Sequence, residues 1–245
     1  MLAELYHAHH LLYREDIPFW QGLAAQSGGS ILELGCGTGR VTLELAGARH
    51  DVLGLDNDAD TLAVLQRRLA ESNLSNVAYI MADMTEFSLE RTFALIILPC
   101  NTYSTLSPQQ RQATLGCVQK HLGPGGLFAA SMLNSARVAE LPESGEPELE
   151  ETIVHPHSGQ PVQVSSAWQR NESSFQVIWH YDHMLPDGQV ERTTVTANHE
   201  LASTEDYQRE LQQAGFGLKD VYGDFEGGSY DADSPYFIFV AERQS

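Results

Sequence analysis

Continuous apolar runs alternate with stretches of helical periodicity through the first half of the chain. Short, mainly apolar runs predict buried strands over residues 31–34, 52–55, 77–81, 93–98 and 127–133. Between these runs apolar side chains recur every three or four positions, as at Leu62, Leu65 and Leu69, which predicts helices. Residues 2–25 are also predicted to be helical, and Pro18 can open a new helix there. Strands that alternate with helices indicate right-handed crossovers and a parallel sheet covered on both faces.

This rhythm stops at Ser135 and returns near Ser203. Residues 141–161 are rich in Pro, Gly and Glu and are expected to form a loop, whereas residues 162–197 show the period-two pattern of strands. Two further strands are predicted over residues 218–222 and 236–240. No helical pattern separates them, so they should pair antiparallel.

The expected fold is α/β. It is a doubly wound, seven-stranded, mostly parallel sheet of Rossmann-like type with an inserted small antiparallel β-sheet. Residues 1–140 and 199–245 are expected to form the α/β core, and residues 141–198 the β insertion.

The amino-acid composition makes some classes of binding partner improbable, nucleic acid among them. The 245-residue chain has 33 acidic and 14 basic side chains and a formal net charge of −19, so its average field repels nucleic acid. No apolar run approaches the roughly 18 residues that span a membrane, and the first residues do not resemble a signal peptide. The three cysteines fit reduced thiols in the cytoplasm. Paired histidines such as His155 and His157 lack the carboxylate spacing of a metal site, and no metal is expected.

A glycine loop follows the first predicted strand. Gly35, Gly37 and Gly39 precede a helical pattern, so backbone N–H groups should approach a ligand at a helix N-terminus. The spacing is G-x-G-x-G, and Arg40 stands where the dinucleotide fingerprint has its last glycine. The loop alone is weak evidence for a particular cofactor.

Polar residues also follow the other predicted strands. Asp56 ends the second strand, Asp83 ends the third, and the fourth runs into Leu98-Pro-Cys-Asn-Thr-Tyr103. Ligands of open parallel sheets bind beyond these carboxyl ends. A carboxylate at Asp56 can bind ribose hydroxyls and one at Asp83 an exocyclic amine, which together describe a nucleoside pocket without a phosphate cradle.

These motifs make the sequence similar to class I S-adenosylmethionine-dependent methyltransferases. The matching segments are Leu32-Glu-Leu-Gly-Cys-Gly-Thr-Gly39, Gly54-Leu-Asp-Asn57, Met81-Ala-Asp-Met84 and Phe93–Leu98, within residues 12–135 and 200–243. The resemblance implies that S-adenosyl-L-methionine is the cofactor. The residues that it assigns to the cofactor are Tyr13, Glu33, Gly35, Cys36, Gly37, Thr38, Gly39, Asp56, Asn57, Asp83, Met84 and Leu98. Cys36 is interpreted as a small filler in the loop rather than as a nucleophile.

The expected activity is methyl transfer to an O or N atom of a small-molecule acceptor. Tyr103 is the first candidate for a catalytic contact with the acceptor and Asp224 the second. The N-terminal segment is expected to act as a lid, with Tyr13 near the methionyl end. The insertion is expected to line the acceptor pocket or, alternatively, to form a homodimer contact.

Two other classes of function stay open. A nucleic-acid or protein methyltransferase would use the same core, although the Asn/Asp-Pro-Pro-aromatic signature of exocyclic-amine methylation is missing after Leu98. A non-catalytic protein could use the fold to bind the cofactor or a partner. Turnover with any acceptor distinguishes this last class from an enzyme.

Overall fold

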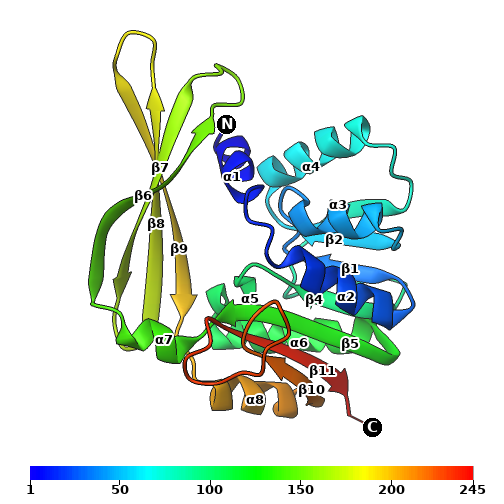
Figure 1. Ribbon diagram of the computed structural model, residues 1–245. Helices are drawn as coiled ribbons and strands as arrows, with labels where there is room; N and C mark the ends of the chain where they lie inside the picture. The colour runs from blue at the N-terminus through cyan, green and yellow to red at the C-terminus, as the bar shows by residue number, and fades with distance from the viewer. Residues whose placement is uncertain (245) are drawn as a thin grey trace.

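The computed structural model describes residues 1–244. Its helices and strands alternate through the first half of the chain, as Figure 1 shows. In chain order the elements are α1 (Leu2–His10), α2 (Ile17–Ser27), β1 (Ile31–Leu34), α3 (Arg40–Gly47), β2 (Val52–Asp56), α4 (Ala59–Glu71), β3 (Val77–Met81), β4 (Phe93–Leu98), α5 (Thr102–Thr105), α6 (Pro108–His121), β5 (Leu122–Leu133), α7 (Ser135–Glu140), β6 (Ser144–Val154), β7 (Pro161–Arg170), β8 (Ser174–Met184), β9 (Val190–Glu200), α8 (Thr204–Gln213), β10 (Phe216–Tyr222) and β11 (Tyr236–Arg243).

The larger sheet confirms the predicted seven-stranded, doubly wound architecture. Its strand order is β10-β11-β5-β4-β1-β2-β3. β1 pairs in parallel with both β2 and β4, so the direction of winding reverses between β1 and β4. β10 and β11 pair antiparallel, as predicted from the lack of a helix between them. The reversal next to β1 creates the switch point at which such sheets bind ligands.

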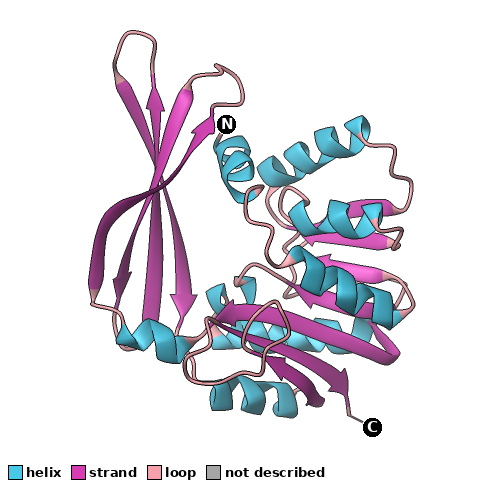
Figure 2. Cartoon of the chain, in the orientation of Figure 1, coloured by secondary structure: helices cyan, strands magenta, loops and turns pink. Residues whose placement is uncertain are grey.

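Helices cover both faces of this sheet (Figure 2). On one face α2 and α3 bury Trp20, Val41 and Leu45 against the strands. On the other face α6 and α8 bury Leu115 and Leu211. Every residue of β1 is buried, which explains why this strand has no polar alternation in the sequence. No helix within residues 1–244 is long and apolar enough to cross a membrane.

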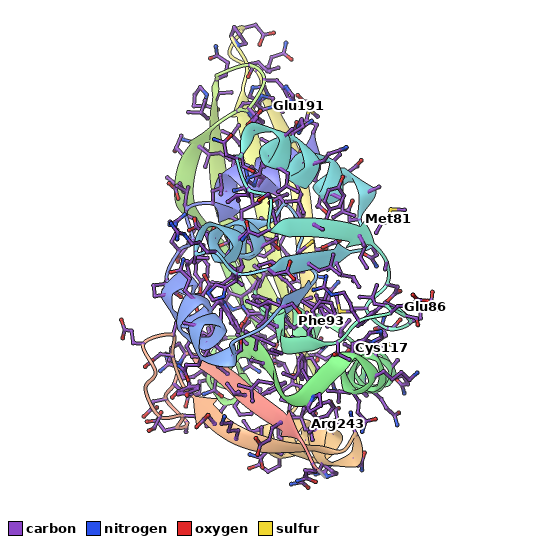
Figure 3. All side chains as sticks on the ribbon, turned by 90° about the vertical axis from the view of Figure 1, so that its right-hand side faces the viewer. Met81, Glu86, Phe93, Cys117, Glu191 and Arg243 are labelled. Carbon is purple, nitrogen blue, oxygen red and sulfur yellow. The ribbon has the colours of Figure 1, made fainter. Side chains whose placement is uncertain are left out.

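The insertion is a four-stranded antiparallel sheet in the order β6-β7-β8-β9 that stands beside the core (Figure 1). The prediction of a loop over residues 141–161 was wrong, because β6 occupies Ser144–Val154. β6 is an edge strand with mostly exposed, Glu-rich side chains, so its sequence lacks the alternation that burial of one face imposes. In Figure 3 Glu191 lies near one end of the long axis of the molecule and Arg243 near the other.

The N-terminal segment is helical, as predicted over residues 2–25, and it is divided into two helices, the second of which contains Pro18. The chain leaves the helical path after His10, and α2 then begins with Pro18 in its first turn. The apolar side of α1 packs against the insertion, where Leu5 joins Ile153, Val162 and Tyr181 in a small core. α1 also contacts α4, so it lies between the insertion and the α/β core (Figure 1).

Candidate active site

A cavity of about 360 Å³ opens at the switch point. The glycine loop after β1, the end of β2 and the loop after β4 form most of its wall, and α1 covers it. The lining residues that matter here are Tyr6, His10, Glu33, Gly35, Cys36, Gly37, Thr38, Arg40, Asp56, Asn57, Ala82, Met84, Cys100 and Thr102. His7 Nδ1 lies 2.8 Å from Thr38 Oγ1, which ties α1 to the glycine loop.

The glycines of the loop have different roles. Gly37 has a φ of +52°, and a Cβ added there would meet no atom within 4 Å, so this stretch of backbone faces open space. A Cβ on Gly39 would instead overlap Leu65 Cδ1 of α4. Gly37 therefore leaves room for a ligand, whereas Gly39 permits close packing of the loop on α4.

Hydrogen bonds hold the Asp56 carboxylate next to the glycine loop. Its Oδ2 accepts a hydrogen bond of 2.7 Å from the Gly37 N–H, and its Oδ1 accepts one of 2.9 Å from the Asp58 N–H. A carboxylate oxygen can accept more than one hydrogen bond. The carboxylate is thus held in one orientation and keeps capacity for the hydroxyls of a ligand.

Two residues near the loop are buried. Burial raises the pKa of the Glu33 carboxyl to about 8, and the Thr42 hydroxyl donates to that carboxyl. Cys36 is also buried, which raises the pKa of its thiol. A Cβ on Gly54 would lie 2.8 Å from Cys36 Sγ, so β2 uses a glycine to make room for this sulfur. These contacts fit Cys36 as a filler.

A buried ion pair connects the N-terminal segment to the cavity. Arg40 Nη1 and Nη2 each donate to an Asp16 carboxylate oxygen at 2.6 Å, and the side chains are 9% and 1% exposed. Arg40 also donates to the Tyr13 carbonyl at 2.8 Å and to Cys100 Sγ at 2.8 Å. The sequence marked Arg40 only as a departure from a fingerprint, and no local pattern links it to Asp16.

A second cavity of about 360 Å³ lies between α1 and the insertion. It is lined by His9, His10, Leu12, Tyr13, Glu150, Glu151 and Trp179. His10 lines both cavities, so its side chain borders both spaces.

Comparison with known proteins identifies this arrangement. The family profile described as "Methyltransferase domain" matches residues 31–126, which contain the glycine loop and the ends of β2 and β4. The cypemycin N-terminal methyltransferase of a Streptomyces species is 27% identical over 221 residues, which cover 89% of this chain and 84% of that protein. The chain is a class I S-adenosylmethionine-dependent methyltransferase.

Two solved structures show how far the fold is shared. An S-adenosylmethionine-dependent methyltransferase from Clostridium acetobutylicum ATCC 824 superposes with a TM-score of 0.83 at 13% identity, covering 99% of this chain and 98% of that one. CalS10, an amino pentose methyltransferase from Micromonospora echinaspora with bound cofactor, gives a TM-score of 0.68 at 21% identity over 91% of this chain and 88% of that one. S-adenosylmethionine is the cofactor of the class of methyltransferase to which this chain belongs. The open space at Gly37 and the fixed Asp56 carboxylate fit a nucleoside ligand of this kind.

Some residues assigned to the cofactor do not line the first cavity. The Asp83 carboxylate accepts hydrogen bonds of 2.8 and 2.7 Å from the Thr85 N–H and hydroxyl, and its neighbours Ala82 and Met84 form the wall instead. Leu98 is fully buried in the core. Gly39 packs on α4, as described above.

Tyr13 lines the second cavity of the methyltransferase rather than the first. Its hydroxyl bonds to Glu15 and lies 2.8 Å from the Tyr236 hydroxyl.

Neither predicted contact with the acceptor lines either cavity. Tyr103 is 0% exposed and packs edge-on against Phe128 and Phe239, because the turn of α5 directs Thr102 toward the cavity and Tyr103 into the core. Its assignment to the acceptor was therefore wrong. The Asp224 carboxylate accepts from the Glu226 and Gly228 N–H groups at 2.9 and 2.8 Å, so it fixes the loop after β10.

Proposed function

We propose that this methyltransferase transfers a methyl group to an N or O atom of a small molecule held in the second cavity. The observation that carries the proposal is that His10 borders both cavities. When bound, S-adenosylmethionine supplies a methyl group activated by a sulfonium sulfur. In this proposal Asp56 binds the ribose, the backbone at Gly37 contacts the methionyl part, and the stretch from Ala82 to Met84 contacts adenine.

The volume of the second cavity and the net charge of the protein support a small-molecule acceptor. A space of about 360 Å³ is at the lower end of ligand pockets and holds no folded macromolecule. The net charge of −19 disfavours a polyanion. Two of the similar proteins are named as a cypemycin N-terminal methyltransferase and an amino pentose methyltransferase.

The cover over the site also supports methyl transfer. Glu4 of α1 accepts from Arg67 of α4 and lies 2.6 Å from His157 Nε2 of the insertion, so one carboxylate connects all three parts. Methyl transfer is a displacement that requires alignment of the acceptor and exclusion of water. We infer that α1 and the insertion together provide this enclosure.

The proposal is tested with a metabolite panel and labelled cofactor, with the gain of one methyl group measured by mass spectrometry. Trp179→Ala removes an aromatic wall of the second cavity and should lower kcat/KM for the acceptor by about tenfold or more, because a buried aromatic contact is worth upward of 1.4 kcal/mol. Cofactor affinity should stay within about twofold of the parent protein.

Val190→Ala is the matched control, because Val190 belongs to the same sheet as Trp179 but is the first residue of β9 and is 54% exposed. Equal acceptor kinetics for Trp179→Ala and Val190→Ala would show that the second cavity does not hold the acceptor.

A further inference from the structure

His10, which borders both cavities, has a defined tautomer. Its Nδ1 lies 3.0 Å from the Tyr6 carbonyl oxygen, which can only accept a hydrogen bond. Nδ1 therefore carries the hydrogen, and Nε2 of the neutral ring keeps a lone pair. No hydrogen bond joins Nε2 to another protein atom within residues 1–244.

The ring of His10 is also held in position. It stacks on Tyr6 with centroids 3.7 Å apart, and it meets the Trp179 ring edge-on at 5.7 Å. Burial is the main cause that lowers the pKa of His10 to about 3, and His9 and Arg40 contribute in the same direction, outweighing the Tyr6 carbonyl and Glu150. The imidazole is thus neutral at physiological pH.

A hydrogen-bonded network centred on His9 lies beside His10. His9, whose ring centroid is 4.8 Å from that of His10, has its Nε2 3.0 Å from the Glu150 carboxylate and its Nδ1 3.1 Å from the Tyr181 hydroxyl. The hydrogen bond from His9 lowers the pKa of Glu150, so this carboxylate is ionised and accepts from Nε2–H. These contacts fix the wall of the second cavity against which an acceptor would lie.

We propose that His10 Nε2 accepts a hydrogen bond from the nitrogen to be methylated, and that this contact selects an amine over a hydroxyl. The inference rests on the proposed function and narrows its acceptor class. A neutral amine brings its own lone pair, so it needs orientation more than deprotonation. A hydroxyl needs a base that takes its proton as the new bond forms.

The atoms balance without a further reactant. The amine lone pair forms the bond to the methyl carbon, and the electron pair of the sulfur–carbon bond stays on sulfur. The product is an ammonium group that then loses its proton to water. His10 holds one N–H of the amine throughout and stores no proton, as its weak basicity requires.

The experiment combines imidazole NMR with kinetics. Nitrogen-15 spectra of the full chain should show His10 as the Nδ1–H tautomer, neutral down to about pH 4. With S-adenosylhomocysteine present and at about pH 10, where both amines are largely neutral, benzylamine or glucosamine should shift the Nε2 resonance. Benzyl alcohol and glucose should not be methylated.

Variants test the same contact by turnover. His10→Phe keeps a ring without an acceptor atom and should lower kcat/KM for the methylated amine by about 30-fold, in line with loss of a buried hydrogen bond. His10→Gln restores an acceptor oxygen near the Nε2 position and should recover about a third of the activity. His180→Phe is the control, because His180 bonds to Thr194 and lines neither cavity.

Several outcomes overturn the inference. An Nε2–H tautomer, titration of His10 near pH 6.5, an Nε2 resonance unchanged by every amine, or preference for the alcohol of a pair would each do so. Calorimetry with S-adenosylmethionine separates the two levels: if the cofactor binds and the amine contact fails, only the role of His10 is lost, whereas loss of cofactor binding contradicts the proposed function.

Discussion

Arg40→Met should lower the free energy of unfolding by about 3–5 kcal/mol, the cost of leaving one member of a buried ion pair without its partner. Asp16 is 1% exposed on its side chain and would keep only the 3.0 Å hydrogen bond from the Trp20 indole. Chemical denaturation followed by fluorescence measures the change. Since Arg40 also holds the Tyr13 carbonyl and Cys100, the loss should loosen the N-terminal segment over the cavity.

Two further variants make this test specific. Asp16→Asn combined with Arg40→Met removes both charges and keeps an acceptor for Trp20, so the double variant should be more stable than Arg40→Met alone. Arg14→Met breaks an ion pair with Glu44 of similar length, 2.7 Å, but Arg14 is 55% exposed, and its loss should cost less than about 1 kcal/mol. Similar destabilisation by Arg14→Met and Arg40→Met would contradict the importance of burial.

Asp56→Ala should weaken binding of S-adenosylmethionine by about 1.5–3 kcal/mol, or roughly 10- to 150-fold, because a charged hydrogen-bond partner is lost. Isothermal titration calorimetry measures the affinity. Asp56→Asn keeps one acceptor oxygen and should fall between the parent protein and Asp56→Ala. Gly37→Ala places a methyl group in the open space beside this carboxylate and should also weaken binding while the fold is retained.

The control for Asp56 is Asp51→Ala, which removes an exposed carboxylate paired with Arg91 shortly before β2. Its cofactor affinity should equal that of the parent protein. Parent-like affinity in a folded Asp56→Ala variant would remove the ribose assignment.

The strands and the glycine loop could be predicted because their signals are local. β1 and β4 are almost entirely buried, so their sequences are apolar apart from Glu33. The positive φ angles of Gly35, Gly37 and Gly39 occur where the sequence has glycine after a strand. The position of Asp56 beside the first cavity could be predicted because parallel strands end at the same edge of the sheet.

Other features depend on contacts between distant segments. The pairing of Asp16 with Arg40 and the contact of Leu5 with Tyr181 leave no periodic pattern in the sequence. The error at Tyr103 came from one residue step in α5, which decides whether a side chain faces the cavity or the core. His10 and Tyr6 were missed as lining residues because the place of α1 is set by packing on the insertion.

The ionisation of the buried Glu33 carboxyl is coupled to binding of the cofactor. With a pKa of about 8, this carboxyl is largely protonated at neutral pH in the free protein. S-adenosylmethionine carries positive charge on its sulfonium and its amine, and a cation that enters the cavity lined by Glu33 favours the ionised carboxylate. Binding near pH 7 should therefore release protons, and the calorimetric enthalpy should depend on the ionisation enthalpy of the buffer. Glu33→Gln should abolish that dependence, so the heat of binding reports the charge state of a side chain hidden from solvent.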